Sequence, residues 1–354
     1  MSCARREQGS NLRVDHEGAA VDHSWSYDQE DRHEPGRPVV VLGMHRSGTS
    51  VVTRIVSLLG LPLCRDDDLL SGPAPGNPTG HWESLSLLKF NERLLNMFGG
   101  SWVFPPPMSR NWESAPSVAA FRGEGVRVFR NAHPNEDWVW KDPRTCLTLP
   151  FWRTAWRDAP VVVFVSREPL EIYLSLRKRE GLGKAHCIAL WERYTRSALL
   201  GAEGLPMVTI SYEQLMKDSL GVVANLRDDL AGLGVMAHGN VDAAAQCVST
   251  AFGRSREYNY RLQADPDSTE TQRLLIKFIE SLPRTSPKFI ATDLGSESSS
   301  TTELLCAVRC YPPVLSVAAR EAWRAFRRSA AARGLVFRDA LDGHFRVMRS
   351  GHDG

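Results

Sequence analysis

A strand, a tight turn and a helix follow one another near residue 40, and this segment constrains the fold more than any other part of the 354-residue chain. Residues 39–42 are a short continuous apolar run, which is typical of a parallel strand buried on both faces. Gly43 ends the run, and from Thr49 to Leu59 the apolar residues recur with the spacing of an amphipathic helix. This order gathers backbone N–H groups and a helix N-terminus around one point, where they can bind an anion.

The turn itself carries side chains that suit an anion-binding loop. The candidate binding residues in it are His45, Arg46, Ser47, Gly48, Thr49 and Ser50. A loop that binds nucleoside triphosphates would have lysine where Thr49 stands, so the turn does not favour γ-phosphate transfer. Its basic residue is Arg46, which lies inside the loop. From there we expect it to reach the terminal group of a bound anion through a forked pair of hydrogen bonds.

Three further strand patterns define the fold class. They cover residues 138–140, 161–165 and 207–210, and helical stretches separate them. Strands that alternate with helices favour a parallel sheet with helices on both faces. The sequence therefore predicts an α/β protein with three α/β/α layers around a mainly parallel central sheet, like the P-loop NTPases, followed by a helical C-terminal extension.

Changes in composition suggest three regions. Residues 1–37 are acidic and poor in large aliphatic side chains, which predicts a flexible N-terminal arm. Residues 38–263 hold the strand and helix patterns and form the predicted catalytic domain. Residues 264–354 form the predicted helical extension, with a serine-rich linker near residues 295–303.

Composition excludes several classes of partner. The 43 Lys and Arg residues nearly balance the 41 Asp and Glu residues, which argues against a protein that binds nucleic acid by bulk charge. No apolar run approaches the roughly 18 residues of a membrane helix, and the first residues lack the apolar core of a signal peptide, so we expect a cytoplasmic protein without a membrane span. Cys306 and Cys310 have no nearby histidine to complete a zinc site, and no pattern indicates an oligomeric state.

Two more motifs accompany the loop, one over residues 140–144 and one from Ser166 to Ser175. In the second, Arg167 follows a buried strand and Ser175 lies about two turns into the next helix. Together with the loop, these motifs resemble the sulfotransferases that use 3′-phosphoadenosine 5′-phosphosulfate (PAPS), particularly their bacterial branch. The resemblance covers residues 38–263. It implies that the loop binds the 5′-phosphosulfate and that Arg167 and Ser175 bind the 3′-phosphate.

The resemblance also implies an activity. PAPS would be the co-substrate, no metal would be required, and the acceptor would be a small molecule or glycan with a hydroxyl group, such as a carbohydrate, a glycolipid or a secondary metabolite. In-line sulfuryl transfer needs a base for the hydroxyl and positive charge near the leaving oxygen. Lys141 resembles the family's lysine that steadies the bridging oxygen. The family's catalytic histidine, two residues further on, is Pro143 here, so the base must come from elsewhere.

Glu83 is our candidate for the general base, because several sulfotransferases without the histidine use a glutamate in a comparable position. His81 in the same loop and Asp142 are the alternatives. A loop acid such as Glu83 also commonly caps a helix or pairs with an arginine. An Asp-Pro-Arg sequence after a strand often orders a turn, with Asp142 and Arg144 pairing locally.

Residues outside the main motifs have weaker assignments. Tyr212 follows the fourth strand and is interpreted either as a core residue or as a contact to adenine. Arg254 and Arg256 are either surface residues or ligands that close over the 3′-phosphate.

Acceptor pockets in the family are built from variable loops, here expected at residues 64–82, 100–125 and 177–190. Two other functions stay open at this point. One is a P-loop kinase or NTPase in which Asp142 positions Mg²⁺. The other is a catalytically silent nucleotide-binding or scaffolding protein.

Overall fold

The computed structural model describes residues 37–70, 72, 80–109, 111–251, 261–292, 294–310, 335–337 and 347–349. These residues belong to one compact unit, which begins at Pro35. The predicted N-terminal arm, Arg254 and Arg256, and most of the chain after residue 310 lie outside the described residues.

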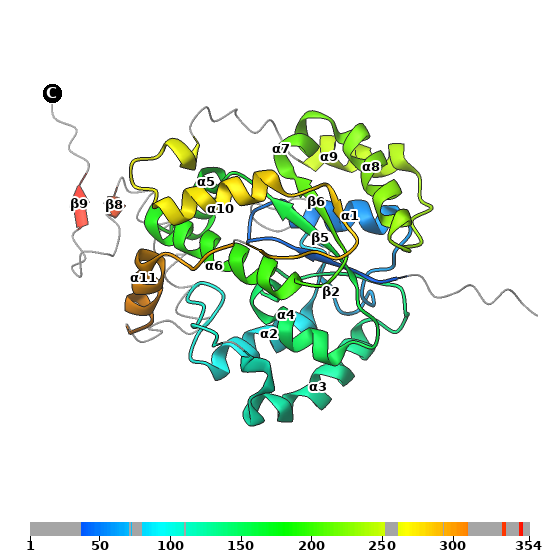
Figure 1. Cartoon of the computed structure of the whole chain (residues 1–354), viewed down its shortest axis with the longest axis horizontal. Coiled ribbons are helices and arrows are strands. Elements are labelled where there is room, and N and C mark those ends of the chain that lie inside the picture. Colours follow the sequence, from blue (N-terminus) through cyan, green and yellow to red (C-terminus); the bar gives the residue numbers. More distant parts are fainter. Residues whose placement is uncertain are drawn as a thin grey trace, which may run out of the picture. The chain divides into compact units, whose positions relative to one another are not determined.

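A five-stranded sheet in the order β4-β1-β5-β6-β7 forms the centre of the unit (Figure 1). Its strands are β1 (Val39–Leu42), β4 (Val139–Lys141), β5 (Val161–Ser166), β6 (Met207–Ser211) and β7 (Thr285–Ser286). The first four strands are parallel, with Val40 beside both Trp140 and Val162, and only β7 at the edge runs antiparallel to β6. The prediction of a mainly parallel central sheet is confirmed.

The pleat of the strands divides the core into two hydrophobic layers. In β1, Val39 and Val41 pack into one cluster while Val40 and Leu42 pack into the other, because successive side chains point to opposite faces. Helices cover both clusters, which gives the predicted three layers (Figure 1). The helices whose residues join the Val39 cluster are α1 (Thr49–Leu58), α7 (Tyr212–Lys217), α8 (Ser219–Gly232) and α9 (Val241–Ala251).

Most of the remaining helices belong to the Val40 cluster. They are α2 (Leu85–Met97), α3 (Pro116–Ala132), α4 (Thr145–Ala155), α5 (Pro169–Glu180), α6 (Lys184–Ala202), α10 (Glu270–Ser281) and α11 (Ser299–Cys310). Short 3₁₀ turns occur at Trp112–Ser114 and Leu262–Ala264, and small antiparallel pairs join β2 (Leu69–Leu70) to β3 (Glu83–Ser84) and β8 (Leu335–Phe337) to β9 (Val347–Arg349). In the described part of the chain, no helix combines the length and apolar character that crossing a bilayer requires.

The described residues after 263 continue the same core. Leu275, Phe289 and Leu305 are buried in the Val40 cluster, and β7 extends the central sheet. The boundary that the sequence predicts at residue 263 therefore does not separate two cores within the described residues. Leu275 and Ile276 of α10 pack into the Val40 cluster, and the burial of such apolar side chains stabilises the fold.

The serine-rich stretch predicted as a linker is instead anchored to α6. Ser298 is buried, and α11 begins at Ser299. The carboxylate of Glu192, which is fully buried in α6, accepts hydrogen bonds from the Ser298 backbone N–H (2.8 Å) and from the side chains of Ser298 and Thr301 (both 2.7 Å). Gln272 of α10 donates to the same carboxylate at 3.0 Å, so one buried acid ties three helices together.

We expect Glu192→Gln to destabilise the fold by about 1–3 kcal/mol. The amide has one acceptor oxygen and brings an NH₂ group that faces the donors of Ser298, Thr301 and Gln272. Urea unfolding followed by circular dichroism measures the difference. Glu303→Gln, at an exposed position of α11, is the matched control and should change the unfolding free energy by less than about 0.5 kcal/mol. Equal effects for the two variants would contradict the anchoring role of Glu192.

Candidate functional site

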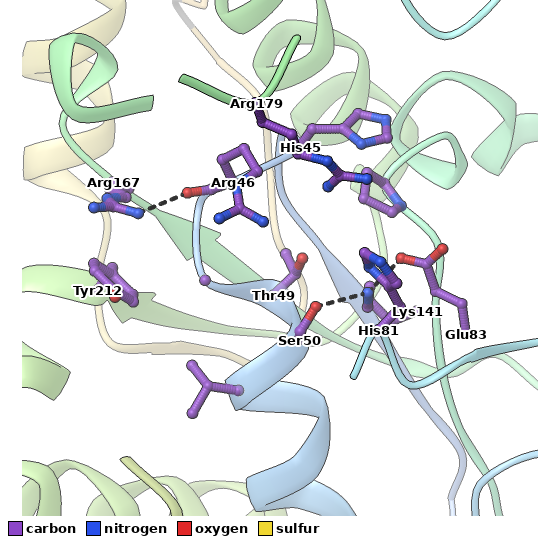
Figure 2. Close-up of a pocket in the computed structure, with 13 residues that line it drawn as sticks. His45, Arg46, Thr49, Ser50, His81, Glu83, Lys141, Arg167, Arg179 and Tyr212 are labelled. Atoms are coloured by element: carbon purple, nitrogen blue, oxygen red, sulfur yellow. Dashed lines mark hydrogen bonds and ion pairs between the residues drawn. The ribbon is translucent and has the colours of Figure 1, made fainter. Parts of the chain in front are cut away.

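A cation-lined pocket opens at the carboxyl ends of three parallel strands (Figure 2). The loop after β1, Lys141 at the end of β4 and Arg167 just after β5 all reach it, because parallel strands end at the same edge of a sheet. About 500 Å³ of empty space lies in the pocket, part of it open to solvent. Its lining residues are His45, Arg46, Gly48, Thr49, Ser50, Val51, His81, Glu83, Lys141, Pro143, Arg167, Arg179 and Tyr212.

The loop after β1 is wound so that the start of α1 faces the pocket. Arg46 and Gly48 have positive φ angles of 72° and 94°, which turn the chain sharply, and the Ser47 N–H donates to the Met44 carbonyl at 3.1 Å. Gly48 is the N-cap of α1 and provides no side-chain cap, and the first turn of the helix contains no acid. No side chain thus caps this end of α1, and the helix dipole favours an anion there.

Arg167 packs against the other side of this loop. Its guanidinium donates from Nη1 to the Arg46 carbonyl (2.9 Å) and from Nε to Glu171 (2.9 Å), and it lies 4.3 Å from the ring centroid of Tyr212. Tyr212 is buried and touches Gly48, where an added methyl group would lie 2.2 Å from Tyr212 Cδ2. Tyr212 thus belongs to the core and also lines the pocket, and its contact to adenine stays a prediction.

Arg46 lines the pocket and also contacts α5. Its Nε donates to Ser175 Oγ at 2.8 Å, so the guanidinium bridges the loop to α5. Ser175 does not itself line the pocket and is connected to it through Arg46. Burial lowers the pKa of Arg46 to about 10, with the charges of Arg179 and Arg167 acting in the same direction. The side chain still carries its charge at neutral pH.

Ser47 and His45 in this loop make contacts that stabilise the surrounding protein. The hydroxyl of Ser47 is buried and donates to the Met44 carbonyl, so it stabilises the turn and does not line the pocket. The ring of His45 packs against Trp102 at a centroid distance of 4.5 Å and against Tyr194 at 5.6 Å. Burial lowers the pKa of His45 well below its usual value, so this imidazole is neutral and adds no charge to the site.

Lys141 and Glu83 form a buried ion pair at the opposite end of the pocket from Tyr212 (Figure 2). Lys141 Nζ lies 2.5 Å from Glu83 Oε1 and 3.1 Å from Ser50 Oγ, and the two charged side chains are only 1% and 9% exposed. The ion pair with Lys141 is formed by the Oε1 atom of Glu83. Glu83 thus lines the pocket beside the most buried cation in it.

A local turn brings Glu83 to this position. Glu83 pairs with Leu70 in the short β2-β3 ladder, and the N–H groups of His81 and Trp82 both donate to the Leu70 carbonyl at 3.1 and 2.9 Å. Trp82 has a positive φ of 56°, and the Arg54 guanidinium lies 4.6 Å from its ring centroid. A strained backbone angle that is held by these contacts is typical of a functional site.

The two alternative bases differ in their placement. His81 lines the pocket, and burial, assisted by the charges of Lys141 and Arg179, lowers its pKa to about 4. A neutral imidazole with this pKa is a weak proton acceptor at neutral pH. Asp142 does not line the pocket: it accepts hydrogen bonds from Asn91 (2.9 Å) and from the Arg144 N–H and guanidinium (both 3.0 Å), as the turn interpretation predicts.

Arg179 is a pocket residue that the sequence did not single out, although it falls within residues 177–190, where an acceptor loop is expected. Its side chain lines the pocket from the last turn of α5. The sequence contains one signal for this position, because Arg179 follows Ser175 by four residues and residues four apart share a helix face. Arg177 and Lys178 stand next to it and are exposed, so the sequence alone does not distinguish the pocket residue from its neighbours.

The chain matches a protein-family model and is similar in structure to several solved proteins. A family model described as the sulfotransferase family matches residues 38–233. No curated protein sequence matches the chain. Among solved structures, the sulfotransferase domain of the olefin synthase from Synechococcus PCC 7002 is 14% identical, with 78% of this chain and 96% of that chain covered and a TM-score of 0.37.

Two other solved structures have comparable scores. A sulfotransferase from Mycobacterium avium is 15% identical, with coverages of 61% of this chain and 67% of that chain and a TM-score of 0.35. A sulfotransferase domain from the curacin biosynthetic pathway is 14% identical, with coverages of 77% and 97% and a TM-score of 0.32.

Proposed function

Because the chain belongs to the sulfotransferase family, we propose that it transfers a sulfuryl group from PAPS to a hydroxyl group of an acceptor. One observation carries the proposal: Arg46, Arg167 and Lys141 converge on the uncapped N-terminus of α1 at the carboxyl edge of a parallel sheet. That arrangement suits a ligand with several anionic groups. A small molecule or a glycan fits the pocket as the class of acceptor.

The residues present fit the proposed donor. Arg167 and the Arg46–Ser175 bridge lie together at the α5 end, where they can hold a phosphate monoester such as the 3′-phosphate. The first N–H groups of α1, with Thr49 and Ser50, can hold the 5′-phosphate. Lys141 contacts Ser50 and lies at the far end, where its charge can stabilise the bridging oxygen as it leaves. In this assignment Arg46 serves the 3′-phosphate and not the terminal group.

The chemistry of the transfer follows from the Glu83–Lys141 pair. When bound, PAPS supplies an activated sulfuryl group, and adenosine 3′,5′-bisphosphate leaves as the sulfur–oxygen bond to the acceptor forms. Glu83 accepts the proton of the acceptor hydroxyl, and Lys141 donates a hydrogen bond to the oxygen on which charge develops. Burial of both groups strengthens these interactions, because the surrounding medium has a low dielectric constant.

The alternatives receive less support from the geometry. A kinase that uses Asp142 for Mg²⁺ would need this carboxylate in the pocket, whereas Asn91 and Arg144 hold it outside. A nucleotide-binding protein without catalytic activity does not require an acid that can act as a base, so the Glu83–Lys141 pair in the pocket favours an enzyme. The cytoplasmic location remains a prediction from the sequence.

Binding of adenosine 3′,5′-bisphosphate is the first test. We expect this product to raise the melting temperature of the purified chain, because a ligand that binds only the folded state stabilises it. Incubation with radiolabelled PAPS and an extract rich in hydroxyl metabolites then identifies the acceptor by the product that gains sulfate. Unchanged melting at millimolar bisphosphate would refute the proposal, and ATP turnover that depends on Mg²⁺ would replace it with the kinase function.

Replacing Arg167 tests the donor end of the pocket. We expect Arg167→Ala to weaken bisphosphate binding by about 1.5–3 kcal/mol, or about 10- to 150-fold, the range of a hydrogen bond to a charged group. Isothermal titration calorimetry measures the affinity. Arg157→Ala removes an arginine whose side chain is 79% exposed and should leave the affinity unchanged. If both variants bind the bisphosphate as the wild type does, the 3′-phosphate is not held by Arg167.

A further inference from the structure

Arg179 is a fourth cation in the pocket, and the donor contacts proposed above do not include it. Its side chain is 34% exposed and lines the pocket one helical turn after Ser175. Its ion pair is with the adjacent Glu180, at 3.1 Å. A pair between neighbours on a partly exposed helix end is weak, so the guanidinium can exchange Glu180 for another anion at little cost.

The other three pocket cations are held by the elements that form the donor site. Arg46 is bonded to Ser175, Arg167 is bonded to the Arg46 carbonyl, and Lys141 is bonded to Ser50 and Glu83. In Figure 2, Arg167 and Tyr212 lie at one end of the pocket, Lys141 and Glu83 lie at the other, and Arg46 lies between them. The Arg179 side chain enters from the last turn of α5, beside His45.

The charge of Arg179 acts on both histidines of the pocket. The pKa of His81 is lowered first by burial, then by the charge of Lys141 and then by that of Arg179. The pKa of His45 is lowered first by burial, then by the charge of Arg144 and then by that of Arg179. The charges that act on the pKa of Tyr212, at the donor end, belong to other residues. These are Arg167, Glu171 and Arg46. The charge of Arg179 also lowers the pKa of Arg46. Its position beside His45 (Figure 2), together with its effect on His45 and His81, favours the end of the pocket where Glu83 lies, which is the side that an acceptor hydroxyl must approach.

We infer that Arg179 binds an oxyanion on the acceptor, so that the acceptor is a hydroxyl compound that also carries a carboxylate or a phosphate group. This inference rests on the proposed function, because it assigns Glu83 to the acceptor side. A guanidinium binds either oxyanion through two parallel hydrogen bonds. A neutral acceptor offers Arg179 no such partner, so we expect an acceptor with an oxyanion to bind more tightly than a neutral alcohol.

Two matched pairs of small ligands test the inference. The carboxylate pair is 4-hydroxybenzoate and 4-hydroxybenzamide, and the phosphate pair is glycerol 3-phosphate and glycerol. Binding is measured by calorimetry on the full chain saturated with adenosine 3′,5′-bisphosphate. In the wild type, the anionic member of at least one pair should bind at least about tenfold more tightly than its neutral partner, and the pair that shows the preference identifies the oxyanion.

Arg179→Gln should reduce that preference to about one and leave the bisphosphate affinity within about threefold of the wild type. Lys178→Gln removes an exposed cation from the same helix turn and should retain the preference. The inference is overturned by a wild type with no preference for either anion, including one that binds none of the four ligands. It is also overturned if Arg179→Gln keeps the preference or lowers the bisphosphate affinity tenfold or more, which would assign Arg179 to the donor. A wild type that does not bind the bisphosphate refutes the proposed function instead.

Discussion

Glu83→Gln should reduce the rate of sulfate transfer by about 10²- to 10⁴-fold, the usual contribution of a positioned general base. The amide keeps the size of the side chain and an oxygen that can accept the hydrogen bond from Lys141, but it cannot take the proton of the acceptor. Binding of adenosine 3′,5′-bisphosphate should not weaken. Because Lys141 loses its carboxylate partner at 2.5 Å, more of its charge is available to the ligand, and the affinity should stay equal or rise.

The measurement is the initial rate with labelled PAPS and the acceptor that the extract screen identifies, together with calorimetric affinity for the bisphosphate. Retained bisphosphate binding shows that the variant is folded. His81→Gln is the informative companion, because His81 lines the same end of the pocket and is neutral at pH 7. If Glu83→Gln turns over normally while His81→Gln does not, the base is His81, and if both are active, neither residue is the base.

Much of the fold follows from local sequence patterns. The continuous apolar run at residues 39–42 is strand β1 without any shift, and the run at 161–165 becomes β5 with one further residue, Ser166. Such runs are unambiguous because a strand buried on both faces has no polar positions. Pro169 begins α5, as its fixed φ angle predicts for a first helical turn.

The elements that sequence reasoning missed are short or depend on distant partners. The strands β2, β3 and β7 have two residues each, too few to show an alternating pattern, and they exist because β2 pairs with β3 and β7 pairs with β6. The serine-rich residues 295–303 have the composition of a linker, but the buried carboxylate of Glu192, more than a hundred residues earlier, orders Ser298. The composition of a segment indicates how much conformational entropy is lost when the segment becomes ordered. It does not show which distant residue forms the contacts that compensate for this loss.

In the candidate site, too, local features can be predicted from the sequence and contacts between distant residues cannot. The anion-binding loop can be predicted from the sequence because the turn, the strand and the helix are adjacent along the chain. The contact of Arg46 with Ser175 and that of Lys141 with Glu83 join residues 129 and 58 positions apart, so only the packed structure shows them. The structure also shows that Ser47 serves the turn itself, which the loop motif does not distinguish from ligand binding.

The contact between Gly48 and Tyr212 makes the loop sensitive to a single methyl group. Gly48 has a φ of 94°, and a Cβ there would lie 2.2 Å from Tyr212 Cδ2, far inside contact distance. The Tyr212 ring would have to move, yet the Arg167 guanidinium packs on it at 4.3 Å and also holds the Arg46 carbonyl. Displacing the ring therefore disturbs both arginines of the proposed donor site.

Gly48→Ala should accordingly weaken bisphosphate binding by more than about 100-fold, because it disturbs two charged contacts that are each worth about 1.5–3 kcal/mol. Gly234→Ala is the matched control: its φ of 84° imposes a similar backbone strain, but no atom lies within 4 Å of the added methyl group. The control should lose about 1–2 kcal/mol of stability and keep its affinity. If the clash is the cause, adding Tyr212→Ala to Gly48→Ala should cost less than the sum of the two single changes. Equal affinities for Gly48→Ala and Gly234→Ala would show that the loop adapts and that its observed conformation is not required to bind the donor.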